Sequence, residues 1–144
     1  MIIKIISIGN KLNSWELDSI NYYLKQIPKN LKIDFINLKS QQNPNYSESE
    51  VISKESKLIM SKISKDDFVV AFDIKGNQMS SKKFSDLIFD CFKTSKVLTF
   101  IIGGSFGLSS EIKDNSNRVL SASLFTFPHR LFRLILIEQI YRAH

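Results

Sequence analysis

A glycine-rich turn between a buried strand and a helix is the feature of this sequence that best fits a ligand site. Residues 97–111 read VLTFIIGGSFGLSSE, in which a near-continuous apolar run, typical of a strand covered on both faces, precedes Gly103 and Gly104. Glycines at this place let the backbone adopt a positive φ, or approach a ligand more closely than a Cβ would allow. Ser109 or Ser110 can cap the helix that follows. Because α/β proteins bind ligands at the carboxyl ends of their strands, we expect a cofactor here.

The glycines match neither of the common phosphate-binding patterns. GGSFGL lacks the G-x-G-x-x-G spacing, lies late in the chain, and has no acidic residue at the end of a following strand to bind a ribose. It is not followed by the Lys-Ser or Lys-Thr pair that a P-loop requires. Taken alone, the three glycines fit a tight turn without a ligand better than they fit a binding site.

Length and composition predict one domain spanning residues 1–144. The chain, 43% hydrophobic, is large enough for one core and too short for two. No segment approaches the roughly 18 apolar residues that a membrane helix needs. The N-terminus lacks both the basic segment and the cleavage site of a signal peptide. We therefore expect a cytoplasmic protein without a membrane partner.

The single cysteine and the net charge narrow the possible chemistry. Cys91 aligns with Phe84, Leu87 and Ile88 at helical spacing, which predicts a small core residue rather than a nucleophile. One cysteine provides no disulfide and no thiolate metal site within a single chain. The formal charge of +6, from 20 Lys and Arg against 14 Asp and Glu, suits an anionic partner.

Apolar patterns alternate between strand and helix, which predicts an α/β fold with a mainly parallel sheet in three layers. Strands are expected over residues 1–8, 31–35, 68–72 and 97–102, with helices between them. The first helix is expected from Trp15 to Gln26, after an N-cap at Asn13 or Ser14. The apolar faces of the three helices are marked by Leu17, Ile20, Leu24 and Ile27; by Val51, Ile52, Glu55, Leu58, Ile59 and Ile63; and by Phe84, Leu87, Ile88, Cys91 and Phe92.

The end of the sequence departs from this alternation. A short helix over about residues 109–117 leads to an apolar loop bearing serine and threonine, and Pro128 then fits the start of a final helix from His129. Residues 131–137 are apolar almost all round the helix, interrupted mainly by Arg133, so this helix must be buried on more than one side. A second copy of the chain could cover it, or the helix could lie within its own core. A buried Arg133 would require a partner.

Three segments together resemble one known family. IIGGSFGL at residues 101–108, SASLFTFPHRLFRLILIEQIYRA at residues 121–143 and VVAFDIKG at residues 69–76 are similar to the RlmH family of pseudouridine N3-methyltransferases, which act on 23S ribosomal RNA. IISIGNK and YYLKQIP match as well, so the resemblance covers essentially the whole chain. This family belongs to the SPOUT class. The resemblance therefore implies a C-terminal trefoil knot, a homodimer and binding to the ribosome.

The resemblance also implies where S-adenosylmethionine binds. In the family this cofactor contacts the residue matching Phe72, the glycine turn matching Gly103 and Gly104, and the loop matching residues 123–128. The loop residues implied to bind it are Ser123, Leu124, Phe125, Thr126, Phe127 and Pro128. Their apolar members would enclose the adenine and their hydroxyls would offer polar contacts, without any metal. On this basis Gly104→Val is expected to abolish cofactor binding and to leave the fold intact.

The implied reaction is a direct displacement in which N3 of the uracil ring attacks the sulfonium methyl and loses its imide proton. His129 is a candidate base, because a helix N-terminus disfavours the imidazolium form. The alternative that we favour is a histidine that orders the loop or contacts RNA. Arg142 is the second candidate catalytic residue, able to bind RNA phosphates or stabilise an imidate. A plain ion pair with Glu138, four residues earlier, is an equally good interpretation.

One departure from the family pattern bears on activity. Relatives of this type continue into an Asn-His-Pro-Tyr-His tail on the substrate side of the pocket, whereas this sequence stops at His144. We expect cofactor binding to tolerate the absence of that tail better than methyl transfer does. Two other functions stay open: a cofactor-binding RNA module that has lost catalysis, and a ribosome-associated or assembly protein without a cofactor.

Overall fold

The computed structural model describes residues 1–9, 11–94, 96–122 and 129–143, with only the backbone of residues 129–131. The described residues form five strands and five helices. In chain order these are β1 (Ile2–Ile8), α1 (Ser14–Leu24), β2 (Lys32–Leu38), α2 (Glu48–Met60), β3 (Phe68–Gln78), α3 (Ser81–Thr94), β4 (Leu98–Ile102), α4 (Ser110–Asn115), β5 (Arg118–Ser121) and α5 (His129–Arg142).

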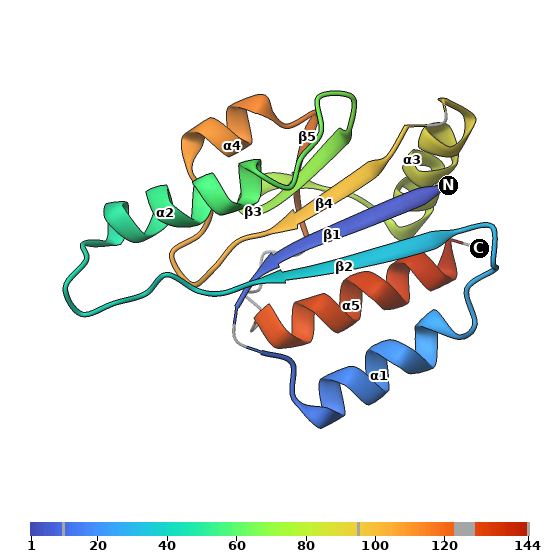
Figure 1. Ribbon diagram of the computed structural model, residues 1–144. Coiled ribbons are helices and arrows are strands. Elements are labelled where there is room, and N and C mark those ends of the chain that lie inside the picture. The colour runs from blue at the N-terminus through green and yellow to red at the C-terminus, as the bar shows by residue number, and fades with distance from the viewer. Residues whose placement is uncertain (10, 95, 123–128, 144) are drawn as a thin grey trace.

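The five strands form one parallel sheet with helices on both faces. The strand order is β2-β1-β4-β3-β5, and every neighbouring pair is parallel. Figure 1 shows α1 and α5 side by side on one face of the sheet and α2 and α4 on the other. The predicted α/β fold with a parallel sheet in three layers is confirmed.

Alternation along the strands divides the core into two clusters. Ile3 and Ile5 pack with α1, α3 and α5, whereas Ile6 and Ile8 pack with α2 and α4. All four side chains are fully buried, as period-2 alternation requires of a strand that is covered on both faces.

Side-chain caps begin four of the helices, and on α3 the Ser80 hydroxyl accepts from the Lys83 N–H at 3.1 Å. The Asn13 side chain accepts from the Glu16 N–H and Glu16 closes a capping box on α1, while Ser47 and Glu50 do the same on α2. Ser109 caps α4 through the N–H of Ile112. Of the alternatives that the sequence left open, Asn13 and Ser109 are therefore the N-caps.

Three strands differ from the prediction, of which β2 only ends three residues later than expected, at Leu38. The sequence pattern missed β5, which has only four residues and follows the short α4 directly. β3 continues past its expected end near Asp73 to Gln78, with a shift in its pairing to β5 between Phe72 and Asn77. Gly76 permits this crossing, because a Cβ there would lie 2.6 Å from the carbonyl carbon of Leu120.

Two residues predicted to face the core are exposed. Leu17 is 43% exposed, and Glu16 takes the buried position in that turn of α1 because its carboxylate pairs with an arginine of α5. Phe92 is 48% exposed, since the buried face of α3 runs through Ile88 and Cys91 and turns away from the next residue. Both predictions were wrong by one position on a helix.

The apolar helix α5 is covered within its own chain. Phe132, Leu136, Ile137 and Ile140 are at most 8% exposed and pack against the sheet and α1. Burial of these four side chains therefore does not need a second copy of the chain. The expected trefoil knot runs through residues 123–128, which lie outside the described residues, and it stays a prediction.

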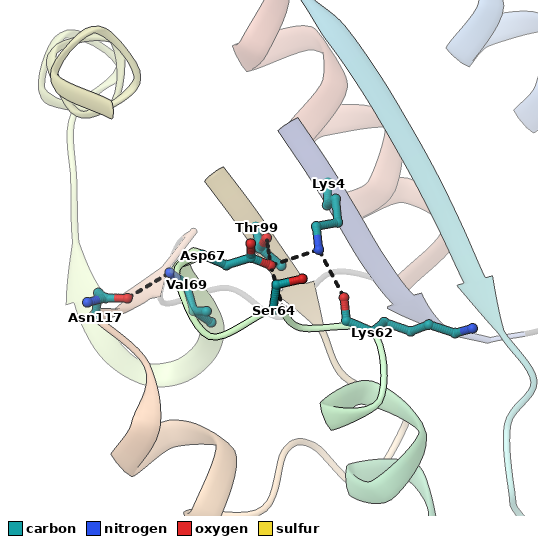
Figure 2. A network of polar contacts seen from close by, with 7 residues as sticks. All are labelled: Lys4, Lys62, Ser64, Asp67, Val69, Thr99 and Asn117. Carbon is teal, nitrogen blue, oxygen red and sulfur yellow. Dashed lines mark hydrogen bonds and ion pairs between the residues drawn. The ribbon is translucent and has the colours of Figure 1, made fainter. Parts of the chain in front are cut away.

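A polar network holds the amino ends of the central strands together (Figure 2). Asp67, just before β3, lies 2.7 Å from the ammonium of Lys4 on β1 and accepts from Thr99 on β4 and from the Ser64 N–H, both at 3.0 Å. The Lys4 ammonium also donates to the carbonyl of Lys62 at 3.0 Å. One carboxylate thus joins β1, β4 and the start of β3 at the edge opposite the glycine turn.

We expect Asp67→Ala to lower the free energy of unfolding by about 3 kcal/mol, because three donors lose their shared acceptor. Urea unfolding followed by circular dichroism measures the change. The control is Asp66→Ala, at the exposed neighbouring carboxylate, which should stay within about 0.5 kcal/mol of the wild type. Equal losses in the two variants would contradict the role given to the network.

Candidate functional site

A mostly apolar cavity of about 230 Å³ lies at the carboxyl ends of β3 and β5, between α3 and α5. We call it the β3–β5–α5 cavity. Its wall includes Phe72, Phe84, Leu120, Phe132, Leu136 and Gln139. At its rim the Ser81 hydroxyl donates to the side-chain oxygen of Gln139 at 2.7 Å. An apolar lining with a few placed polar groups is typical of a small-molecule site.

Phe72, a predicted cofactor residue, forms part of this wall. Its ring meets Phe132 of α5 edge-on, with 4.9 Å between ring centres, and stacks on Phe100 of β4 at 5.8 Å. These are the offset and edge-to-face arrangements that aromatic pairs favour. Phe72 is half-buried, so its ring is held in the core on one side while it lines the cavity on the other.

The glycine turn follows β4 at the same edge of the sheet. The Gly107 N–H donates to the Gly104 carbonyl at 3.0 Å, and Gly107 has a φ of 85°. Among the described glycines it alone has a positive φ, so the positive φ expected at Gly103 or Gly104 occurs at Gly107 instead. Gly103 and Gly104 allow neighbouring side chains to lie close to the backbone. A Cβ on Gly103 would lie 2.9 Å from Leu108, and a Cβ on Gly104 would lie 2.8 Å from Glu55.

Glu55 of α2 supports this turn, although the sequence indicated it only as part of a helical pattern. Its side chain is 3% exposed, and Oε2 accepts from the Gln41 N–H at 2.9 Å and from the Ser40 hydroxyl at 3.4 Å. Oε1 is the atom that a Cβ at Gly104 would meet. The buried carboxylate thereby ties the loop between β2 and α2 to the glycine turn. Gly104→Val would disturb this packing, contrary to the expectation that it leaves the fold intact.

A double-mutant cycle tests this contact. We expect Gly104→Ala to destabilise the protein by about 1–3 kcal/mol, because its Cβ must displace Glu55 or Ile8. Combined with Glu55→Ala, the loss should be smaller than the sum of the two single losses by at least about 0.5 kcal/mol. Gly103→Ala is the control, since its Cβ faces Leu108, and it should be additive with Glu55→Ala. Additivity at Gly104 in urea unfolding would contradict the contact.

The two predicted catalytic residues lie at opposite ends of α5. His129 is its first residue and Arg142 its last, so they are about 20 Å apart along the helix axis at 1.5 Å per residue. Arg142 is exposed and pairs with Glu138, as the ion-pair interpretation predicted, and this hydrogen bond raises the pKa of Arg142. Within one subunit the backbone positions of these two residues are therefore far apart. The predicted cofactor loop, residues 123–128, lies outside the described residues.

Arg133 has the buried partner that its position in an apolar helix requires. Its side chain is 1% exposed, and Nη1 lies 3.6 Å from Oε2 of Glu16, which is equally buried. Nη2 makes a long, 3.5 Å contact with the carbonyl of Ile8 at the end of β1. Glu16 could not be identified as this partner from the sequence, because the capping box of α1 accounts for a glutamate at that position just as well.

In the part of the chain that the structure describes, neither Cys91 nor a cluster of acidic side chains forms a further site. Cys91 is 3% exposed, and its burial, followed by the nearby Asp90 charge, raises the pKa of the thiol, so the prediction of a core cysteine is confirmed. Within the described ranges, no group of three or more His, Cys, Asp or Glu side chains is placed to hold a metal ion. None of the helices described is long and apolar enough to cross a membrane.

Comparisons with known proteins cover the whole chain. The family model described as "Predicted SPOUT methyltransferase" matches residues 1–144. Ribosomal RNA large subunit methyltransferase H of Clostridium botulinum (strain Loch Maree / Type A3) is 39% identical over 99% of this chain and 93% of the relative. Ribosomal RNA large subunit methyltransferase H 1 of Clostridium perfringens (strain SM101 / Type A) is 41% identical over the same shares.

A solved structure supports the fold. The crystal structure of a methylase family protein from Neisseria gonorrhoeae superposes with a TM-score of 0.54, covering 97% of this chain and 81% of that one. At 14% identity this likeness concerns the fold alone. The family match and the two Clostridium relatives carry the assignment further: the chain belongs to the SPOUT methyltransferase family, in the group of the ribosomal RNA large subunit methyltransferases H.

Proposed function

We propose that this protein transfers a methyl group from S-adenosylmethionine to N3 of a pseudouridine in 23S ribosomal RNA, on the ribosome in the cytoplasm. The observation that carries the proposal is the β3–β5–α5 cavity, which lies at the ligand-binding edge of the sheet in a chain whose relatives are named ribosomal RNA methyltransferases. The net charge of +6 supports an anionic polymer as substrate.

The residues around the cavity fit one moiety of the cofactor. Its volume of about 230 Å³ is slightly below the roughly 300–1,000 Å³ of sites that enclose a whole drug-sized ligand. The aromatic wall of Phe72, Phe84 and Phe132 suits a flat apolar group, and we assign the adenine to it. The predicted cofactor loop, Ser123 to Pro128, adjoins the cavity in sequence at Ala122 and would hold the rest. When bound, S-adenosylmethionine supplies an electrophilic methyl group.

The chain's own contribution to the reaction is alignment, exclusion of water and removal of a proton. The imide proton of N3 must leave during attack, and His129 at the N-terminus of α5 is the candidate acceptor, while the role that we favour for it is to order the loop or contact RNA. Arg142 lies at the far end of the same helix. We assign it to the site of a second subunit, where its guanidinium would bind an RNA phosphate.

We also propose that the protein is a homodimer that pairs through α1. Trp15 and Tyr22, seven residues apart and therefore on the same side of this helix, are 48% and 62% exposed, and α1 is the outermost helix of that face. Exposed aromatic side chains that gather on one helix are typical of protein interfaces.

Charge placed on this surface should separate the subunits. We expect Tyr22→Asp to sediment as a monomer and to keep the circular dichroism of the wild type, because a buried aspartate at an apolar interface would lack a partner. Phe89→Asp is the control, since Phe89 is 57% exposed on α3 and outside the proposed interface. A dimeric Tyr22→Asp protein, or a wild type that is itself monomeric, would overturn the assignment of α1.

Methyl transfer to ribosomes tests the function. Labelled S-adenosylmethionine is incubated with the protein and ribosomes from a strain that lacks the modification, and the nucleosides of the 23S RNA are analysed by mass spectrometry. The proposal expects one methyl group per ribosome, on a pseudouridine. Binding of the cofactor without transfer would instead identify a module that has lost catalysis, and the absence of both would identify a ribosome-associated protein without a cofactor.

A further inference from the structure

The Glu16–Arg133 pair joins three elements at the carboxyl edge of the sheet. Arg133 lies in the second turn of α5, Glu16 in the first turn of α1, and the Ile8 carbonyl at the end of β1. Both side chains of the pair are 1% exposed, and Arg133 is the largest fully buried side chain among the described residues. The arrangement is therefore a feature of the interior and not a surface ion pair.

The backbone around the pair is shaped to receive it. A Cβ on Gly9 would lie 1.8 Å from Nη2 and 3.1 Å from Cζ of Arg133, so the guanidinium occupies the space that a side chain at Gly9 would take. The other oxygen of Glu16 accepts from the Asn13 N–H at 3.3 Å and closes the capping box of α1. One carboxylate thus fixes the start of α1 and receives the cation of α5.

Stability alone is a poor reason for such a pair. The desolvation of two charges offsets most of their attraction, and apolar residues of similar volume often stabilise a core equally well. An ion pair is directional, whereas an apolar contact is not. The charged atoms meet only when α5 has one translation along its axis and one rotation about it. Apolar side chains such as Leu136 and Ile137 pack acceptably at several neighbouring positions.

The position of α5 sets the shape of the β3–β5–α5 cavity. Phe132, next to Arg133 in sequence, packs edge-on against Phe72, and Leu136 and Gln139 line the same wall. A displacement of α5 by a fraction of its 1.5 Å rise per residue would move these side chains relative to Phe72. The cavity is thus built from α5, which the ion pair holds, together with α3 and two strands of the sheet.

We propose that Glu16 and Arg133 are positioning residues for methyl transfer, which hold α5 in the register that shapes the cofactor cavity. The inference rests on the proposed function and goes beyond it, because neither residue touches the cavity. If the pair has this role, its replacement lowers cofactor affinity and turnover even in a variant whose folded state is as stable as that of the wild type. A merely structural pair would affect stability and leave the affinity of the folded protein unchanged.

The test replaces both charges by apolar side chains of similar length. Glu16→Leu/Arg133→Met should melt within a few degrees of the wild type, yet bind S-adenosylmethionine about tenfold more weakly in calorimetry and lose about a hundredfold in kcat/KM, as misplacement of about 1 Å does. Arg133→Lys, which keeps a cation opposite Glu16, should retain more of the affinity than the double variant. The matched control is Lys4→Met/Asp67→Asn, which neutralises the pair at the opposite edge of the sheet and should bind the cofactor as the wild type does.

Three outcomes would overturn the inference. A folded double variant with unchanged affinity and turnover would show that the pair has no positioning role. A double variant that does not fold would show that the pair serves folding itself, and an equal loss of affinity in the Lys4→Met/Asp67→Asn control would show a general effect of stability. A wild type that fails to bind S-adenosylmethionine would contradict the proposed function, a result that is distinct from all three.

Discussion

Arg133→Met alone should lower the free energy of unfolding by about 3–5 kcal/mol, because the Glu16 carboxylate stays in the core after its cation is removed. For a chain of this size the loss corresponds to a melting temperature lower by roughly 10 °C. Differential scanning calorimetry of the wild type and the variant measures it. This effect is larger than that of the double variant, because in the double variant neither charge is left without its partner.

The same helix supplies the control for this result. Arg142→Met makes the identical substitution at the exposed ion pair with Glu138, and it should leave the melting temperature nearly unchanged. Comparison of Arg133→Met with Arg142→Met shows whether the loss of stability comes from the burial of the ion pair or from the removal of any arginine. Similar melting temperatures for Arg133→Met and the wild type would show that the buried pair does not contribute to stability.

Phe72→Ala is expected to weaken binding of S-adenosylmethionine by about 1–3 kcal/mol, the value of stacking a base on an aromatic ring. That loss is about 5- to 150-fold in Kd. The physical reason is the removal of one wall of the β3–β5–α5 cavity, where the ring of Phe72 is held against Phe132. Isothermal titration calorimetry at a temperature where the variant is folded measures the affinity.

Phe100→Leu provides the matched control for the cavity. Phe100 stacks on Phe72 and is fully buried, but it lies outside the lining of the cavity. Its replacement should lower stability, as removal of core volume does, and leave the affinity of the folded protein unchanged. If both variants lost affinity equally, or neither did, the adenine would not bind where we place it.

The layered fold was predictable because it depends on local patterns. Apolar runs such as residues 98–102 indicate strands covered on both faces, and the alternation of strand and helix then requires a parallel sheet in three layers. The elements that escaped prediction are those that long-range contacts define. β5 has four residues, too few for a clear pattern. The need for a glycine at position 76 arises only because the backbone of β5 passes close to it.

In the candidate site, too, some residues could be predicted from the sequence, whereas those defined by contacts with distant parts of the chain could not. Phe72 could be named from the resemblance, and the structure places it in the wall of a cavity. Glu16 and Glu55 could not be named, because each fits a helical or capping pattern and its partner lies in a distant part of the chain. Gly104 stays a predicted cofactor residue, and the structure adds a contact that the sequence did not indicate, because Glu55 occupies the space where its side chain would lie.

The most direct test of the account is a calorimetric titration of the wild-type protein with S-adenosylmethionine. We predict saturable binding with one cofactor per subunit, which the Phe72→Ala substitution weakens and the Phe100→Leu substitution does not. A folded wild-type protein that gives no binding heat, and is not stabilised against thermal unfolding by the cofactor, would contradict the assignment of the β3–β5–α5 cavity as a methyl-donor site.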